Sequence, residues 1–394
     1  MPNYLAFLIS LTIIFLPTYL VRFSIFSIPT NLFEVLAITT IFSIFFYKKR
    51  TSLLEIFKQN STIAIATLLI LLGLTISTIE NNTATRSLGI IKSWFVVPMF
   101  FSFLLATLPQ RDYTKALILR CLFASILLVA AISITYAFFG IFTYDGRLKA
   151  FFLSPNHLAM FVAPGIFVGI YLMRKARDSR AILQYSLLVL SLAFIIIVFF
   201  LTKSYSAWIA VFFAYPILML FSRSGFFRYL SRVGAFIFIF ALLISTQIGT
   251  EKFLAATHIS ERSSLASRVM IWKSAAKIIG DNPLWGIGPD MFQEKYLEYQ
   301  KYFPPYLEWA VPQPHNLYLA FWLQTGIVGL LGFFLLIISA FRKIGTLAKN
   351  KKTAALAVLI AVYLTSVLIW GVADTPYWKN DLAFVFWIIL SLVF

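Results

Sequence analysis

Residues 61–78 read STIAIATLLILLGLTIST and contain no charged side chain. A helix of about 20 apolar residues crosses the roughly 30 Å hydrocarbon layer of a bilayer, because its backbone polar groups are bonded internally. Comparable runs recur along the chain, whose mean hydropathy is +0.88. We count twelve of them: 4–20, 31–47, 61–78, 88–108, 116–139, 156–173, 183–201, 204–221, 233–247, 316–341, 353–371 and 380–394. We therefore predict an all-α integral membrane protein, with about twelve transmembrane helices in a single polytopic domain over residues 1–394.

The gaps between these runs are alternately basic and nearly neutral. The basic gaps follow every second run and contain Lys48, Lys49, Arg50, Lys58, Arg111, Lys115, Arg174, Lys175, Arg177, Arg180, Arg223, Arg228, Arg232, Arg342, Lys343, Lys349, Lys351 and Lys352. Basic loops mark the cytoplasmic side, so both termini are predicted to be cytoplasmic. Most of the net charge of +18 arises from this asymmetry. Membrane lipids are therefore expected around the protein, and a nucleic-acid partner is not.

Residues 248–313 form one long gap, which the count places on the outer side between the ninth and tenth runs. Long segments of this kind are usually functional or disordered, and the many aromatic residues here favour a folded segment. A helix is predicted from Ser263 or Ser264 to Ile279, with one face formed by Val269, Trp272, Ala276 and Ile279. A second is predicted over 290–302, before Pro304-Pro305. We expect this segment to form a helical cap on the outer membrane surface.

The outer side lacks clustered carboxylates and paired Cys/His spacing, so we predict no metal site and no cofactor. It does carry cations, which bind anionic groups such as phosphate. They are Lys92, Arg147, Lys149, Lys203, Arg262, Arg268, Lys273 and Lys277. Contact with lipid headgroups is the alternative role for each of them.

His315 is predicted to open the tenth helix, directly after Pro312-Gln313-Pro314. The positive end of the helix dipole disfavours an imidazolium ion, so a neutral ring is expected near pH 7. A neutral imidazole at a water–membrane boundary accepts a proton from a hydroxyl group. The alternative is a histidine that only anchors the helix. His157, at another helix start, is expected to help packing.

Five stretches in order resemble the O-antigen ligase and O-antigen polymerase superfamily. They are Arg147 with Phe151-Phe152-Leu153-Ser154-Pro155-Asn156-His157-Leu158-Ala159; Leu201-Thr202-Lys203-Ser204-Tyr205-Ser206-Ala207-Trp208; Ala266-Ser267-Arg268-Val269-Met270-Ile271-Trp272; Asn282-Pro283-Leu284-Trp285-Gly286-Ile287-Gly288; and Pro314-His315-Asn316-Leu317-Tyr318-Leu319. The twelve-run layout with one large outer segment also resembles that family.

The resemblance implies a metal-independent glycosyltransferase of the bacterial inner membrane, with its active site on the periplasmic side. The donor would be a glycan on undecaprenyl diphosphate. The acceptor would be a sugar hydroxyl, either on lipid A–core, for a ligase, or on a nascent polysaccharide, for a polymerase. The implied catalytic residues are Arg268, which holds the diphosphate, and His315, which assists the acceptor hydroxyl.

The resemblance also implies a set of binding residues for the diphosphate or the glycan. They are Arg147, Lys149, Lys203, Arg262, Tyr205 and Asn316. Tyr205 departs from the family pattern, which has arginine at this point of the turn. Lys203 or Arg147 is expected to supply the missing charge.

Two other functions compete with the transferase. A transporter for a small anion would use the same cations, but it would also tend to have inverted repeats and paired ionisable groups at mid-membrane. The charges of Glu34, Lys92 and Asp381 are instead scattered. A non-catalytic scaffold would not need outer arginines beside a neutral histidine.

Overall fold

The computed structural model describes residues 1–25, 28–109, 111–220, 234, 237–238, 241–250, 253–254, 264–304 and 310–394. Most of them are helical. The α-helices are α1 (Asn3–Ile14), α2 (Leu32–Phe45), α3 (Leu53–Gln59), α4 (Ser61–Glu80), α5 (Ala84–Ile90), α6 (Val97–Ala106), α7 (Arg111–Phe138), α8 (Pro155–Asp178), α9 (Ile182–Leu201), α10 (Tyr205–Leu220), α13 (Ser264–Asp281), α14 (Phe292–Tyr299), α15 (Leu317–Lys349), α16 (Ala354–Trp370) and α17 (Asn380–Leu390). Shorter elements are the 3-10 segments η1 (Leu16–Leu20), η3 (Gln300–Tyr302) and η4 (Ser391–Val393), and the π-helical turn η2 (Ile91–Val96).

Within the described residues, six helical segments are long and apolar enough to cross a membrane: 61–80, 84–106, 112–138, 155–178, 182–201 and 317–349. Five shorter apolar helices coincide with other predicted runs. The helical membrane class is therefore confirmed. The ninth run, 233–247, lies partly outside the described residues, so the total of twelve spans stays a prediction.

A small antiparallel sheet is the part of the fold that the sequence analysis did not anticipate. It consists of β1 (Arg22–Ile25) and β2 (Ile28–Asn31), where only a short loop around Arg22 was expected. The Asn31 side chain accepts a hydrogen bond from the Glu34 backbone and starts α2 directly after β2. The connection between the first two helices therefore reverses within a hairpin.

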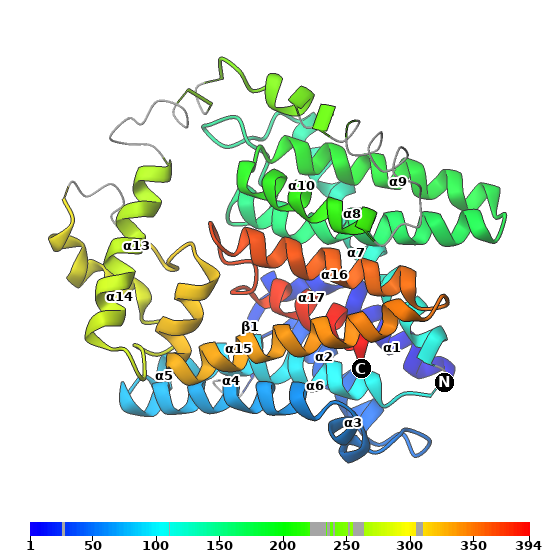
Figure 1. Ribbon diagram of the computed structural model, residues 1–394, viewed down its shortest axis with the longest axis horizontal. Helices are drawn as coiled ribbons and strands as arrows, with labels where there is room; N and C mark the ends of the chain where they lie inside the picture. The colour runs from blue at the N-terminus through cyan, green and yellow to red at the C-terminus, as the bar shows by residue number, and fades with distance from the viewer. Residues whose placement is uncertain are drawn as a thin grey trace.

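The bundle is held together by close packing of α4 against α15, which lie side by side in the lower part of Figure 1. A Cβ atom on Gly73 would come within 2.5 Å of the Gly329 backbone nitrogen, so only small residues permit this approach. α15 is 33 residues long and runs beyond the predicted end at residue 341. It is broken at Gly326, whose φ is 62° and ψ −174°.

The outer segment carries α13 and α14, which Figure 1 shows together at one end of the bundle. Both predicted helices are confirmed, at Ser264–Asp281 and Phe292–Tyr299. On the predicted apolar face of α13, Val269 and Ala276 are exposed and Ile279 is buried. The buried positions are Ser267, Met270, Ile271, Ser274, Ala275, Ile278 and Ile279. The apolar ones form a separate small core with α14 and α15, so this helix packs on protein through a second face, and its contact with the membrane surface stays a prediction.

Four connections meet at the end of the bundle that the sequence places outside, which we call the outer end. Leu148 N donates to Leu201 O at 2.9 Å, which joins the segment before α8 to the turn between α9 and α10. Leu317 N donates to Gly371 O at 2.7 Å, which joins the start of α15 to the end of α16. These bonds bring residues far apart in the sequence to one place, where polar side chains gather.

Candidate active site

Arg147 lies against the turn between α9 and α10. Its Nε donates to the Thr202 carbonyl at 2.9 Å, and its Nη1 lies 3.7 Å from a carboxylate oxygen of Asp145. The side chain is only 14% exposed. Burial lowers the pKa of Arg147, Asp145 opposes this, and the like charge of Arg268 lowers the pKa further. The positive charge is therefore fixed at the turn that contains Tyr205.

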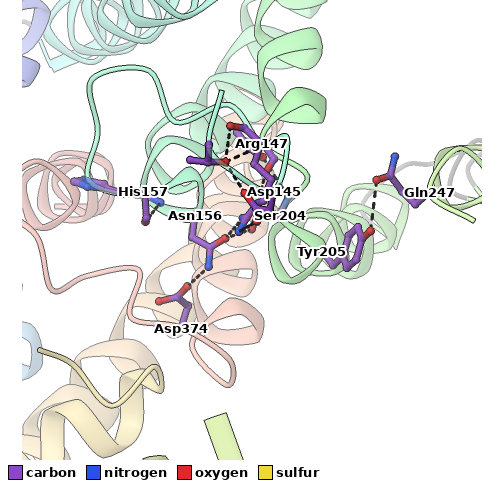
Figure 2. A network of polar contacts seen from close by, with 11 residues as sticks. Asp145, Arg147, Asn156, His157, Ser204, Tyr205, Gln247 and Asp374 are labelled. Carbon is purple, nitrogen blue, oxygen red and sulfur yellow. Dashed lines mark hydrogen bonds and ion pairs between the residues drawn. The ribbon is translucent and has the colours of Figure 1, made fainter. Parts of the chain in front are cut away.

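Asn156 connects this arginine to a carboxylate on the opposite side. Its Oδ1 accepts from Arg147 Nη2 at 2.5 Å and from Ser204 Oγ at 3.0 Å, and its Nδ2 donates to Asp374 Oδ2 at 2.9 Å. Figure 2 shows the amide between these partners. It projects from the first turn of α8, whose start is fixed because the Ser154 hydroxyl accepts from the backbone N–H of His157. A neutral side chain thus separates a buried cation from a buried anion.

Asp374 continues the network to His315. One carboxylate oxygen, Oδ1, lies 3.2 Å from His315 Nδ1 and accepts from Thr375 N at 2.9 Å. Burial raises the pKa of Asp374, but the His315 hydrogen bond and the charges of His315 and Arg268 outweigh this and lower it to about 2. An ionised carboxylate only accepts, so Nδ1 of His315 carries the proton. In the neutral ring this leaves Nε2 as the acceptor.

His315 is held by its backbone as well. The indole Nε1 of Trp272, on α13, donates to the His315 carbonyl at 3.3 Å. His315 has a φ of 47°, a left-handed conformation that non-glycine residues rarely adopt and that is enriched at functional sites. The side chain is 37% exposed, whereas its partner Asp374 is 6% exposed. The ring is therefore anchored on one nitrogen and open to solvent.

Arg268 lies on α13, four residues before Trp272. It is half-buried, and its charge acts on both Arg147 and Asp374. The structure thus brings four chain segments together around one cluster, comprising Arg147, Asn156, Arg268, His315 and Asp374. The cluster combines two guanidinium groups with an oriented imidazole.

The remaining predicted binding residues lie around this cluster in different ways. Lys203 has a φ of 45° at the turn, and a Cβ on Gly146 would lie 3.5 Å from its Nζ, so the ammonium reaches back to the segment that holds Arg147. Tyr205 donates to Gln247 Oε1 at 3.4 Å, on the far side of Figure 2 from Asp374. Lys149 is exposed. Arg262 lies outside the described residues.

Asn316 has a structural role. Its Oδ1 accepts from the backbone N–H groups of Tyr318 and Leu319, each at 3.0 Å, and its Nδ2 donates to Val372 O at 3.0 Å. The side chain caps α15 and ties it to the segment that carries Asp374. Any contact between Asn316 and substrate remains a prediction.

Sequence analysis missed Asp374 and the bridging role of Asn156. Asp374 stands in a short connection between α16 and α17, for which no function was predicted from the sequence. A lone carboxylate among apolar runs was the available signal. Asn156 was quoted within a family stretch, but spacing alone does not reveal a contact 218 residues away with Asp374.

His157 belongs to a second, fully buried cluster. Its Nε2 lies 3.0 Å from both carboxylate oxygens of Asp381, and the Tyr19 hydroxyl lies 3.5 Å away. The His157 and Asp381 side chains are 2% and 0% exposed. Its ring packs against Phe152, with centroids 4.6 Å apart. His157 therefore fixes the start of α8 in the core, as expected from the sequence, while its neighbour Asn156 faces the polar network.

A metal site would need three or more carboxylate, histidine or cysteine side chains close together. The part of the chain that the structure describes contains no such group. At the cluster itself, Asp374 and His315 are the available ligands, and both are already bonded to protein groups. The cluster instead offers fixed positive charge and a proton acceptor, which suit the departure of an anion and the activation of a hydroxyl group.

Comparison with known proteins supports one family. A search of curated proteins finds no match. The family model described as O-Antigen ligase matches residues 190–334, a range that includes Tyr205, Arg268 and His315. Arg147, Asn156 and Asp374 lie outside that range and join its residues only in the folded protein. The match covers residues 190–334 and confirms the resemblance to the O-antigen ligase and polymerase superfamily that was drawn from the sequence.

Proposed function

We propose that this membrane protein is a glycosyltransferase that moves a glycan from undecaprenyl diphosphate to a sugar hydroxyl on the periplasmic side of the bacterial inner membrane. The acceptor is lipid A–core or a growing polysaccharide. The observation that carries the proposal is the continuous link from Arg147 through Asn156 and Asp374 to His315, with the charge of Arg268 acting on Asp374. It joins positive charge for a diphosphate to an oriented base.

The chemistry requires two groups at once. The acceptor oxygen attacks the anomeric carbon as its proton passes to Nε2 of His315. The bond from that carbon to the diphosphate breaks, and its electron pair leaves with the diphosphate. Diphosphate is a good leaving group when its charge is neutralised, so the reaction needs cations more than a general acid.

The two arginines have different parts in this proposal. Arg147 is 14% exposed and its donors already bond protein groups, so it acts mainly through its charge and by shaping the turn. Arg268, which is half-buried on α13, is proposed to contact the diphosphate, for which its planar fork is suited. Lys203 and Lys149 extend the positive surface around them.

Asn156 is proposed to keep the donor and acceptor halves separate. Without the amide, the buried guanidinium of Arg147 and the carboxylate of Asp374 would attract each other in a low-dielectric site. A direct ion pair would neutralise the Arg147 charge that is proposed to act on the diphosphate. It would also draw Asp374 away from His315, whose ring would lose its orientation. The neutral bridge preserves both.

An anion transporter remains the alternative. It would use the cations, but it gives no reason for the ionised Asp374 to orient His315.

Deletion of the gene tests the proposal and distinguishes its two forms. Core without polymer, together with polymer retained on the lipid carrier, indicates a ligase. Core with a single repeat indicates a polymerase. Unchanged lipopolysaccharide and unchanged lipid-linked glycan would contradict both. With purified protein, transfer is expected to continue in excess EDTA, and loss that only magnesium or manganese restores would refute metal independence.

A further inference from the structure

A second polar hollow lies beside the cap, at the outer end of α4. Its volume is about 280 Å³, and it is lined by Glu80, Asn81, Asp281, Asn282, Pro283, Leu284, Trp285 and Gly286. The volume is near the lower end of the roughly 300–1,000 Å³ range of small-molecule sites. It suits one compact ring better than a longer segment.

The hollow is built on a rigid backbone. Ile287 N donates to Leu323 O at 2.6 Å, and Ile327 N donates to Leu284 O at 3.0 Å, on either side of the break in α15. Gly286 has a φ of 66°, and a Cβ there would come within 2.3 Å of Leu323 O. The segment that follows α13 is therefore fixed in shape, and the hollow exists before any ligand binds.

The lining combines an aromatic ring with hydrogen-bonding groups. Trp285 is 40% exposed at this hollow, so its ring is available for stacking. Glu80 and Asp281 supply carboxylate oxygens, and Asp281 also pairs with Lys277 Nζ at 3.6 Å. The two asparagines supply amide oxygens, because their Nδ2 groups already donate to backbone carbonyls. A pyranose has the matching features, an apolar C–H face and a rim of hydroxyl groups that donate to such oxygens. The Glu80 carboxylate disfavours an acidic sugar or an anionic lipid headgroup.

The hollow is set back from the active-site cluster along α13. Trp272 bonds the His315 carbonyl, and Asp281 ends the same helix nine residues later. At 1.5 Å per residue this is about 14 Å along the axis. A short run of linked sugars bridges such a separation.

We infer that this hollow is a subsite for a neutral sugar of the glycan. This sugar is separated by several glycosidic bonds from the sugar whose anomeric carbon reacts. The inference rests on the proposed function, since it takes the glycan to be the substrate. Binding here would select donors by a sugar remote from the diphosphate and would appear in KM more than in kcat.

Binding is tested without catalysis. The probe is the oligosaccharide released by mild acid from the cell's own lipid-linked glycan, with saturation-transfer NMR on purified protein. Trp285→Ala should weaken binding about tenfold, through loss of the stacked ring. Trp285→Phe, which keeps a ring, should retain most of it. Tyr302→Ala removes another exposed aromatic of the outer segment, outside this lining, and should bind like wild type.

The same variants are then assayed for transfer. For a full-length donor glycan, Trp285→Ala should raise KM about tenfold with kcat unchanged, while a donor with a single sugar should react as with wild type. Failure of wild type to transfer any glycan refutes the proposed function. The NMR experiment measures oligosaccharide binding without transfer, so it tests the subsite separately. The subsite is refuted if wild type does not bind the oligosaccharide, or if Trp285→Ala binds it equally well.

Discussion

Asp374 receives hydrogen bonds from three directions: from the His315 imidazole, the Asn156 amide and the backbone of Thr375. This saturation keeps a carboxylate ionised although it is buried, and it orients the imidazole. The Asp374 pKa of about 2 lies below its ordinary value of 3.8. Its contribution to stability is therefore complete above about pH 4 and is lost as pH falls through about 2.

Asp374→Asn is expected to lower kcat and to move the acid limb of the pH–rate profile to lower pH. Removing a negative charge 3.2 Å from Nδ1 disfavours the imidazolium ion that forms when the ring takes the proton of the acceptor hydroxyl. The measurement is kcat against pH for variant and wild type. An unchanged acid limb would show that Asp374 does not act through His315.

Arg268 is predicted to bind the donor diphosphate. Arg268→Ala should lower kcat/KM by about 10²–10³-fold, the usual cost of removing one charge-stabilising donor. Arg268→Lys keeps the charge but loses the planar fork, and it should recover only part of the activity. Lys273→Ala removes an exposed cation from the same helix and is the matched control. Equal effects at positions 268 and 273 would reduce Arg268 to a general surface charge.

At the scale of elements, the contact between α15 and the segment after α13 depends on two glycines, Gly286 and Gly326. A Cβ on Gly326 would lie 2.4 Å from Leu284 O, and its φ of 62° already disfavours other residues. Gly326→Ala should therefore destabilise the protein by about 1–3 kcal/mol. Gly345→Ala, in the same helix with open space around it, should be neutral or slightly stabilising. Thermal unfolding of both variants in detergent measures the difference, and equal melting temperatures would contradict this account of the break.

Apolar periodicity and turn residues allowed most of these elements to be predicted. The long runs matched helices because a bilayer requires continuous internal hydrogen bonding. The helix α13 was predicted from its apolar spacing, but the bond from Trp272 to the His315 carbonyl was not, because it joins residues 43 positions apart. The hairpin of β1 and β2 was missed because four-residue strands give too little pattern.

The site was predictable only where a residue stood in a local motif. His315 and Arg268 followed from helix starts and family stretches. The contact between Asn156 and Asp374 depends on how α8 and the segment after α16 pack, and this tertiary arrangement leaves no signature at short spacing.

For the whole molecule, orientation is the main prediction. Residues 248–313 are expected on the periplasmic side, and the basic connection after α8 on the cytoplasmic side, from the asymmetry of Lys and Arg. Single cysteines at Ser264 and Ser179, both exposed, are introduced on a Cys121→Ser background. An impermeant thiol reagent on intact spheroplasts should label position 264 only. Labelling of 179 but not 264 would invert the topology and place the cluster in the cytoplasm.

The central claim is that His315 takes a proton from the acceptor hydroxyl during glycan transfer. The most direct measurement is the transfer rate of purified His315→Ala and His315→Gln with a lipid-diphosphate glycan donor, alongside a donor-binding assay. We predict a fall of about 10²–10⁴-fold in kcat for both variants, with donor binding retained, because an amide can hold a hydroxyl group but cannot take its proton. Near wild-type turnover by His315→Gln would contradict the claim and leave His315 as a positioning residue.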